Sequence, residues 1–208
     1  MNIEQFIRDN YAAACRKQNK LKDGDQAMVA IVHDDTNLGA DAVSKWMSGY
    51  GLQRGISKDV RKRIVGAYVN FVRAQRPLDS RIGNDELLEK YGRLYRMFAG
   101  VKDRNWTSAT SKLLWCMYPK RGVIYDAFVW RALVVLQIVD PALATGQKLG
   151  SRPEGKGAAA HEEAIAHYKR YQVMVRKIEA RYRDLSFPLF FVFQGCGLMP
   201  PDCAQAES

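Results

Sequence analysis

The sequence predicts an all-α protein, a compact domain built from several helices. Three observations support this. Apolar residues recur at helical spacing along most of the 208 residues. Residues that typically start and stop helices stand at the ends of these stretches. No stretch shows the alternation of apolar and polar residues that indicates a strand. The length fits one domain over residues 1–195, followed by a C-terminal tail over 196–208 that we expect to be frayed.

The first quarter of the chain contains one clear amphipathic stretch and two shorter segments. A helix is predicted over residues 3–19, and its apolar positions are Ile3, Phe6, Ile7, Tyr11 and Ala14. The apolar run over 27–32 fits either a strand or a turn of helix. Residues 34–37 favour a turn, and a helix over 40–50 follows and ends at glycines.

Two longer helices are predicted next, over residues 58–76 and 86–99. Each carries an apolar stripe with a period of three to four residues. The predicted boundary residues are Ser57 and Pro77 for the first helix, and Asn84 or Asp85 and Gly100 for the second.

A helix, a short turn and a second helix are predicted between residues 107 and 139. Residues 107–111 (TSATS) offer several caps for a helix that ends before Pro119. The turn at 120–122 leads to Asp126, which is the predicted N-cap of a helix over 127–139.

The last third of the chain begins with a loop. Asp140 and Pro141 form a cap followed by a proline in the first helical position. Glycine and basic residues dominate 146–157, which we expect to be a mobile loop. A long helix is predicted over 158–184, and an apolar helix or turn over 187–194.

The charge of the chain favours a polyanionic partner. Thirty-two Lys and Arg face 22 Asp and Glu, a net charge of +10. Basic residues cluster in 54–76 and 169–183, and such clusters attract phosphates. The alternative is that these are solvated helix faces. The predicted contacts to nucleic acid are Arg54, Lys58, Arg61, Lys62, Ser108, Thr110, Ser111, Lys120 and Arg121.

Cysteine and histidine usage predicts no metal site. The four Cys and three His show no zinc-type spacing. Cys196 and Cys203 could pair, although the cytosol would keep them reduced. We expect a cytoplasmic, nucleoid-associated monomer with no membrane partner, because the start lacks a signal-peptide pattern and no apolar run is long enough to span a bilayer.

One segment suggests chemistry. Residues 106–133 (WTSATSKLLWCMYPKRGVIYDAFVWRAL) place Lys112 near the start of one apolar helix and Asp126 at the start of the next. The helix dipole and apolar neighbours would both lower the pKa of the Lys112 amine toward that of a usable nucleophile. An aspartate at a cap stays ionised and could stabilise a developing cation. The alternatives are an exposed helix lysine and an aspartate that only caps.

This segment resembles the helix-hairpin-helix (HhH-GPD) DNA glycosylase superfamily, most of all bacterial relatives of the 8-oxoguanine DNA glycosylases. The resemblance rests on SATSKLLW, which places Lys112 in the catalytic lysine position, and on VIYDAFVWRAL, which places Asp126 in the catalytic aspartate position. It implies an all-helical fold with a helix-hairpin-helix element and a central cleft. It also implies base flipping and Schiff-base chemistry at the sugar C1′, without a cofactor.

Three hypotheses about function follow. The first is a glycosylase and abasic-site lyase that acts on a flipped damaged or modified base of double-stranded DNA. The second is a non-catalytic DNA-binding protein on the same scaffold, and the third is a module whose basic face binds an acidic protein. For the first hypothesis, the candidate residues of the base pocket are Trp115, Phe128, Trp130 and Gln194. The two tryptophans and Phe128 fit a core role equally.

Overall fold

A computed structural model describes residues 24–34, 36–146 and 148–181 of the chain. Within these residues every regular element is helical and no strand occurs, so the all-α prediction is confirmed. Residues 24–33 are helical. The elements that follow are α2 (Ala40–Gly49), α3 (Lys58–Ala74), α4 (Asn84–Val101), α5 (Thr107–Met117), α6 (Ala127–Val139), the 3₁₀ helix η1 (Pro141–Ala144) and α7 (Ala158–Arg181).

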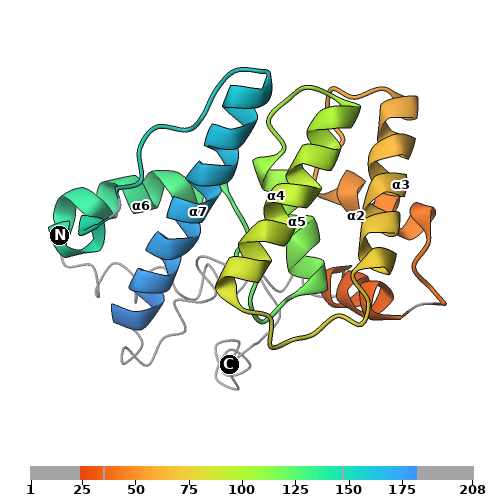
Figure 1. The fold of residues 1–208 in the computed structure, drawn as a ribbon, viewed down its shortest axis with the longest axis horizontal. Coiled ribbons are helices and arrows are strands. Elements are labelled where there is room, and N and C mark those ends of the chain that lie inside the picture. The colour runs from red at the N-terminus through yellow and green to blue at the C-terminus, as the bar shows by residue number, and fades with distance from the viewer. Residues whose placement is uncertain (1–23, 35, 147, 182–208) are drawn as a thin grey trace, which may run out of the picture.

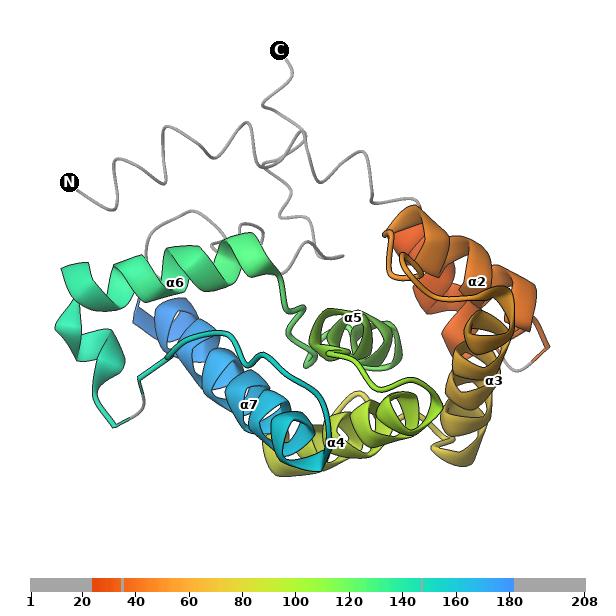
Figure 2. The ribbon, with the colours of Figure 1, turned by 90° about the horizontal axis from the view of Figure 1, so that it is seen from above.

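Helix α5 is the most deeply buried helix of the described structure. Ten of its eleven residues are buried, and Ser108 is the exception. It lies in the middle of the molecule, with α6 and α7 on one side and α2 and α3 on the other (Figure 2). Direct contacts join it to α4 and α7. The side chains of α5 therefore reach solvent only near its N-terminal end.

Three predicted N-caps are confirmed. The Asp140 carboxylate accepts from the amide of Ala142 (3.3 Å) at the start of η1, in which Pro141 takes the first position. The Ser57 hydroxyl accepts a hydrogen bond from the amide of Val60 (3.3 Å) at the start of α3. The Asp126 carboxylate accepts from the amides of Phe128 (2.7 Å) and Val129 (3.3 Å) at the start of α6. Each cap satisfies amides that have no partner within the helix, which fixes where the helix begins.

Other predicted boundaries are wrong. Helix α4 begins after Gly83 without a side-chain cap and continues through Gly100 to Val101. A glycine ends a helix when it adopts a left-handed conformation, and Gly100 does not. Residues 107–111 lie inside α5, and the Asn105 carboxamide accepts from the amide of Thr107 instead (2.9 Å). The run over 27–32 is helical, which excludes the strand alternative.

The segment from Gly122 to Tyr125 crosses the core without regular structure. Its backbone polar groups are satisfied by side chains, because a buried carbonyl without a partner would be costly. The hydroxyls of Tyr168 and Tyr171 donate to the carbonyls of Val123 (2.7 Å) and Ile124 (3.1 Å). We call residues 122–125 the buried connection.

Gly122 starts the buried connection at a point of close approach. A Cβ atom there would lie 2.9 Å from the Trp115 Cα atom and 3.2 Å from the Tyr118 carbonyl oxygen. Glycine lets the chain turn tightly after α5, and its amide donates to the same Tyr118 carbonyl (2.6 Å). This turn brings the connection back along α5 toward Lys112.

Candidate functional site

Lys112 lies on α5, one turn from its N-terminal end, and only 7% of its surface is exposed. Its amine donates to the Ser108 hydroxyl (3.1 Å) and to the carbonyl oxygen of Tyr125 (3.3 Å). The amine also lies 5.7 Å from the centre of the Tyr50 ring, on its face. The side chain is thus held by three separate segments of the chain. The alternative of an ordinary exposed helix lysine is excluded.

The buried connection sets the position of the Tyr125 carbonyl. The amide of Tyr125 donates to the Ser111 hydroxyl (2.9 Å), and its own hydroxyl shares a hydrogen bond with His167 Nε2 (3.2 Å). Burial lowers the pKa of His167 to about 4, so the imidazole is neutral at pH 7. Burial also raises the pKa of Tyr125 to about 12. Tyr125 is therefore held by hydrogen bonds at its backbone amide and at its hydroxyl, and the hydroxyl is neutral at pH 7.

A buried carboxylate accompanies the amine. Asp25 is 3% exposed, and its oxygens accept from the Trp46 indole (3.1 Å) and the Tyr50 hydroxyl (2.6 Å). Burial raises the pKa of Asp25, while these two hydrogen bonds and the positive charge of Lys112 oppose the rise. Asp25, Tyr50 and Lys112 form one connected group of an acid, a phenol and an amine.

A cavity of about 430 Å³ opens beside this group, at the N-terminal end of α5. Ser108 and Tyr125, the hydrogen-bond partners of Lys112, line it together with Tyr50. Its charged lining residues are both arginines, Arg104 and Arg152. Because the positive end of a helix dipole adds to these two charges, the cavity favours an anionic ligand.

Asp126 directly follows Tyr125, whose carbonyl Lys112 contacts, but neither Lys112 nor Asp126 is among the residues that line the cavity. Its carboxylate is turned to the first amides of α6, where it serves as the cap. It is half-buried. The capping role holds under every hypothesis about function, as expected for an N-terminal aspartate.

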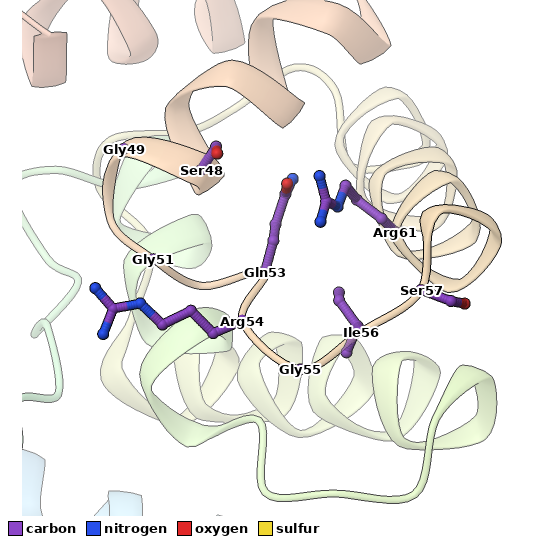
Figure 3. Close-up of a pocket in the computed structure, with 9 residues that line it drawn as sticks. All are labelled: Ser48, Gly49, Gly51, Gln53, Arg54, Gly55, Ile56, Ser57 and Arg61. Carbon is purple, nitrogen blue, oxygen red and sulfur yellow. The ribbon is translucent and has the colours of Figure 1, made fainter.

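A second hollow lies on the other side of the loop between α2 and α3. This loop passes through Gly51 and Gly55, which both have positive φ (65° and 72°). The hollow measures about 490 Å³, and Arg54, Arg61, Gln53 and the Ser57 cap line it. Figure 3 shows the Gln53 amide and the Arg61 guanidinium pointing toward each other, while Arg54 points away from both.

The two hollows adjoin. Gly51 lines both, and the Arg104 guanidinium donates to the carbonyl of Arg54 (2.9 Å). Two arginines thus line each hollow, Arg104 and Arg152 the first and Arg54 and Arg61 the second. We call these four the arginine row. Lys58 and Lys62 are exposed on α3 beside it.

Other predicted nucleic-acid contacts lie elsewhere. Thr110 and Ser111 are fully buried, whereas Ser108 lines the cavity. Lys120 and Arg121 are exposed, but they follow the C-terminal end of α5. An eleven-residue helix spans about 16 Å, so this pair is a full helix length from the cavity.

The predicted base-pocket residues are scattered. Trp115 is in the core, and its indole donates to the Pro119 carbonyl (3.1 Å). Trp130 is half-buried and donates to the Gly150 carbonyl (3.2 Å), while Phe128 is 75% exposed on α6. Gln194, Cys196 and Cys203 lie outside the described residues, as does the helix predicted over 3–19.

Sequence reasoning did not select Asp25, Tyr50 or Arg104. They come from segments that are far from Lys112 in sequence, and no local pattern connects them to it. Arg152 belongs to the loop over 146–157, which the sequence predicts to be mobile and basic. The one available signal was an acidic residue two positions before the apolar run over 27–32, as Asp25 is.

No protein-family model, curated protein or solved structure matches the chain. Among the described residues, no group of three or more His, Cys, Asp or Glu is placed to hold a metal ion. None of the described helices combines the length and apolarity that a membrane span requires.

Proposed function

We propose that this protein binds double-stranded DNA and excises a flipped base, with Lys112 as the attacking amine and a helix-hairpin-helix-like element formed by α4, the turn at 102–106 and α5. The observation that carries the proposal is the setting of Lys112. Its amine touches two residues that line a cavity rimmed by arginines, at the N-terminal end of a helix. Nucleophilic amines, anion contacts and a pocket are the three parts that this chemistry needs.

The arginine row supplies the grip on the DNA backbone. Guanidinium groups bind phosphates in a bidentate manner, and the α5 N-terminus adds backbone amides. Arg104 and Arg152 flank the cavity that would serve as the central cleft, so the flipped nucleotide is held by phosphates on either side. Extrusion costs a few kcal/mol, which contacts in the pocket offset.

The reaction follows from the groups at hand. The lone pair of the Lys112 amine forms a bond to the sugar C1′, and the bond from C1′ to the base breaks with its electron pair leaving on the base. The base takes, as it departs, the proton that Asp25 receives from the amine. Asp25 accepts the proton that the amine gives up, and the Asp126 carboxylate stabilises the positive sugar. The C1′–O4′ bond of the resulting amino sugar then breaks, and O4′ takes a proton from water, which gives an imine. Loss of a C2′ proton from this imine permits β-elimination of the 3′ phosphate.

Borohydride trapping on abasic duplex DNA tests this proposal. The unmodified chain is expected to form a covalent adduct, and Lys112→Gln is expected to form none while its affinity for DNA stays within a few-fold. Lys169→Gln on α7 removes the same charge from an exposed position and serves as the control. An adduct that persists in Lys112→Gln would exclude Lys112 as the nucleophile.

A second candidate function is DNA binding without catalysis. The observation that favours it is the engagement of both catalytic candidates, since the Lys112 amine is bonded on two sides and the Asp126 carboxylate serves as a cap. In that case DNA binding is salt-dependent and no adduct forms on any substrate. In either case we propose a monomer that acts in the cytoplasm, at the nucleoid.

A further inference from the structure

Helix α6 exposes an apolar surface of unusual extent. Five large hydrophobic side chains are exposed among the described residues, and four of them lie on this helix. Their exposed fractions are 75% for Phe128, 51% for Val135, 75% for Ile138 and 46% for Val139. We call these four residues the α6 patch. Contiguous exposed apolar patches mark interaction surfaces.

The α6 patch lies along one face of the helix, which it shares with Arg131, whose guanidinium lies 5.5 Å from the centre of the Phe128 ring. At 100° per residue its members fall on one side, and the buried Leu133 and Gln137 fall on the opposite side. The buried side meets α7 and η1, and α6 forms one edge of the molecule (Figures 1 and 2). The arrangement is that of a helix packed on one side and uncovered on the other.

The end of α7 lies next to the α6 patch. The last described residue, Arg181, forms an ion pair with Asp140 (2.7 Å), the residue that follows the last turn of α6. The remaining 27 residues of the chain therefore leave the described structure at one end of the patch. Six extended residues span about 20 Å, which is about the length of the helix α6. A chain that starts at Arg181 can therefore reach along the whole helix.

The composition of that remaining chain suits an apolar surface. Residues 185–193 read LSFPLFFVF, and seven of these nine are Leu, Phe or Val, with no charged residue. Leaving both this segment and the α6 patch in water would forgo the hydrophobic stabilisation of covering them. A tether of a few residues gives an effective concentration in the millimolar range, which favours an intramolecular partner over a second molecule.

We propose that residues 185–193 dock on the α6 patch within the same chain. The N-terminal segment is the weaker candidate, because the first described residues lie beside α2, where Asp25 bonds Trp46 and Tyr50, on the far side of α5 (Figure 2). The docking is independent of the proposed glycosylase activity. It covers the exposed side of α6, so that both sides of this helix are buried.

Photocrosslinking in the full chain tests the docking. Replacing Ile138 by a photoreactive benzoyl-phenylalanine, itself large and apolar, is expected to link position 138 to a peptide from 185–193. The yield should not depend on protein concentration. The matched control places the same group at Met97, a 37% exposed apolar residue on α4, and should give no such link. Links to residues 1–23, links between two copies, or no link to 185–193 would each overturn the proposal.

Proteolysis provides a second, independent readout. Chymotrypsin cleaves after the phenylalanines of 185–193 only when that segment is released. Ile138→Asp is expected to raise the cleavage rate there about tenfold, because burial of an isoleucine side chain shifts the docked population by at least that factor. Met97→Asp should leave the rate unchanged. Cleavage that is already fast in the unmodified chain and insensitive to Ile138→Asp would overturn the proposal.

Discussion

The Lys112 side chain is buried and restrained, unlike the side chain of a typical surface lysine. The restraint comes from the backbone and side-chain groups around its amine. Ser108, the Tyr125 carbonyl and the Tyr50 ring approach it from three segments. Such a lysine loses side-chain entropy on folding. The restraint holds the amine against Ser108 and Tyr125, two residues that line the cavity, before any ligand arrives.

Asp25 allows the functional and structural roles of this group to be separated. Burial raises its pKa, so the ionised carboxylate at pH 7 costs folding free energy. Asp25→Asn is therefore expected to leave the midpoint of thermal unfolding unchanged or higher. The same variant should slow adduct formation on abasic DNA at least about tenfold, because the proton acceptor is lost. The exposed Asp41→Asn is the control for both measurements. A large fall in thermal stability would show that Asp25 is structural.

At the scale of the elements, the two glycines Gly122 and Gly100 make a matched pair. Gly122→Ala places a Cβ atom 2.9 Å from the Trp115 backbone, so we expect it to lower the free energy of unfolding by about 1–3 kcal/mol. Gly100→Ala adds a methyl group in open space inside α4, and should raise it by about 0.5–1 kcal/mol. Urea unfolding measures both. Equal effects would mean that the turn after α5 relaxes freely.

Helix boundaries were predictable where a side chain makes the cap. Ser57 and Asp126 cap α3 and α6 through their own oxygens, and that chemistry is visible in one sequence. The starts of α4 and α5 follow Gly83 and Trp106, neither of which provides a side-chain cap. The start of α5 is marked instead by the Asn105 carboxamide, which accepts from the amide of Thr107, whereas no side chain marks the start of α4.

The candidate site was predictable in part for the same reason. Lys112 and Asp126 lie 14 residues apart in one recognisable segment. Asp25, Tyr50 and Arg104 reach the same place only through the packing of α2 and α5 against the first helical segment. Sequence spacing can suggest a nucleophile, whereas the groups that surround it depend on the tertiary fold.

At the scale of the whole molecule, the net charge of +10 and the arginine row predict salt-dependent binding to DNA. The logarithm of the binding constant should fall with the logarithm of salt concentration by about 0.9 for each phosphate contacted. Arg104→Gln is expected to reduce that slope by about 0.9. Arg81→Gln, at a position whose side chain is 89% exposed, should change it little. A salt response that is flat in the unmodified chain would argue for a partner other than nucleic acid.

His167 links global stability to pH. Its pKa is lowered from 6.5 to about 4 by burial, so the unfolded chain binds more protons between these values. The contribution of His167 is complete above pH 6.5 and is lost as the pH falls toward 4, by an amount on the order of 2–3 kcal/mol. His167→Gln should remove this part of the pH dependence in urea unfolding. If the free energy of unfolding depends on pH in the same way in the unmodified chain and in His167→Gln, this prediction is wrong.

The hydrogen bond from the Trp46 indole to Asp25 gives the molecule a built-in optical probe. Trp106 and Trp115 are sealed in the core, and a Trp130→Phe variant removes the remaining, half-buried tryptophan on α6. Trp46 shares its carboxylate partner with Tyr50, whose ring lies against the Lys112 amine. Any ligand that moves this lysine changes the electric field on an indole one contact away. Occupancy of the cavity can therefore be followed by intrinsic fluorescence, without a label.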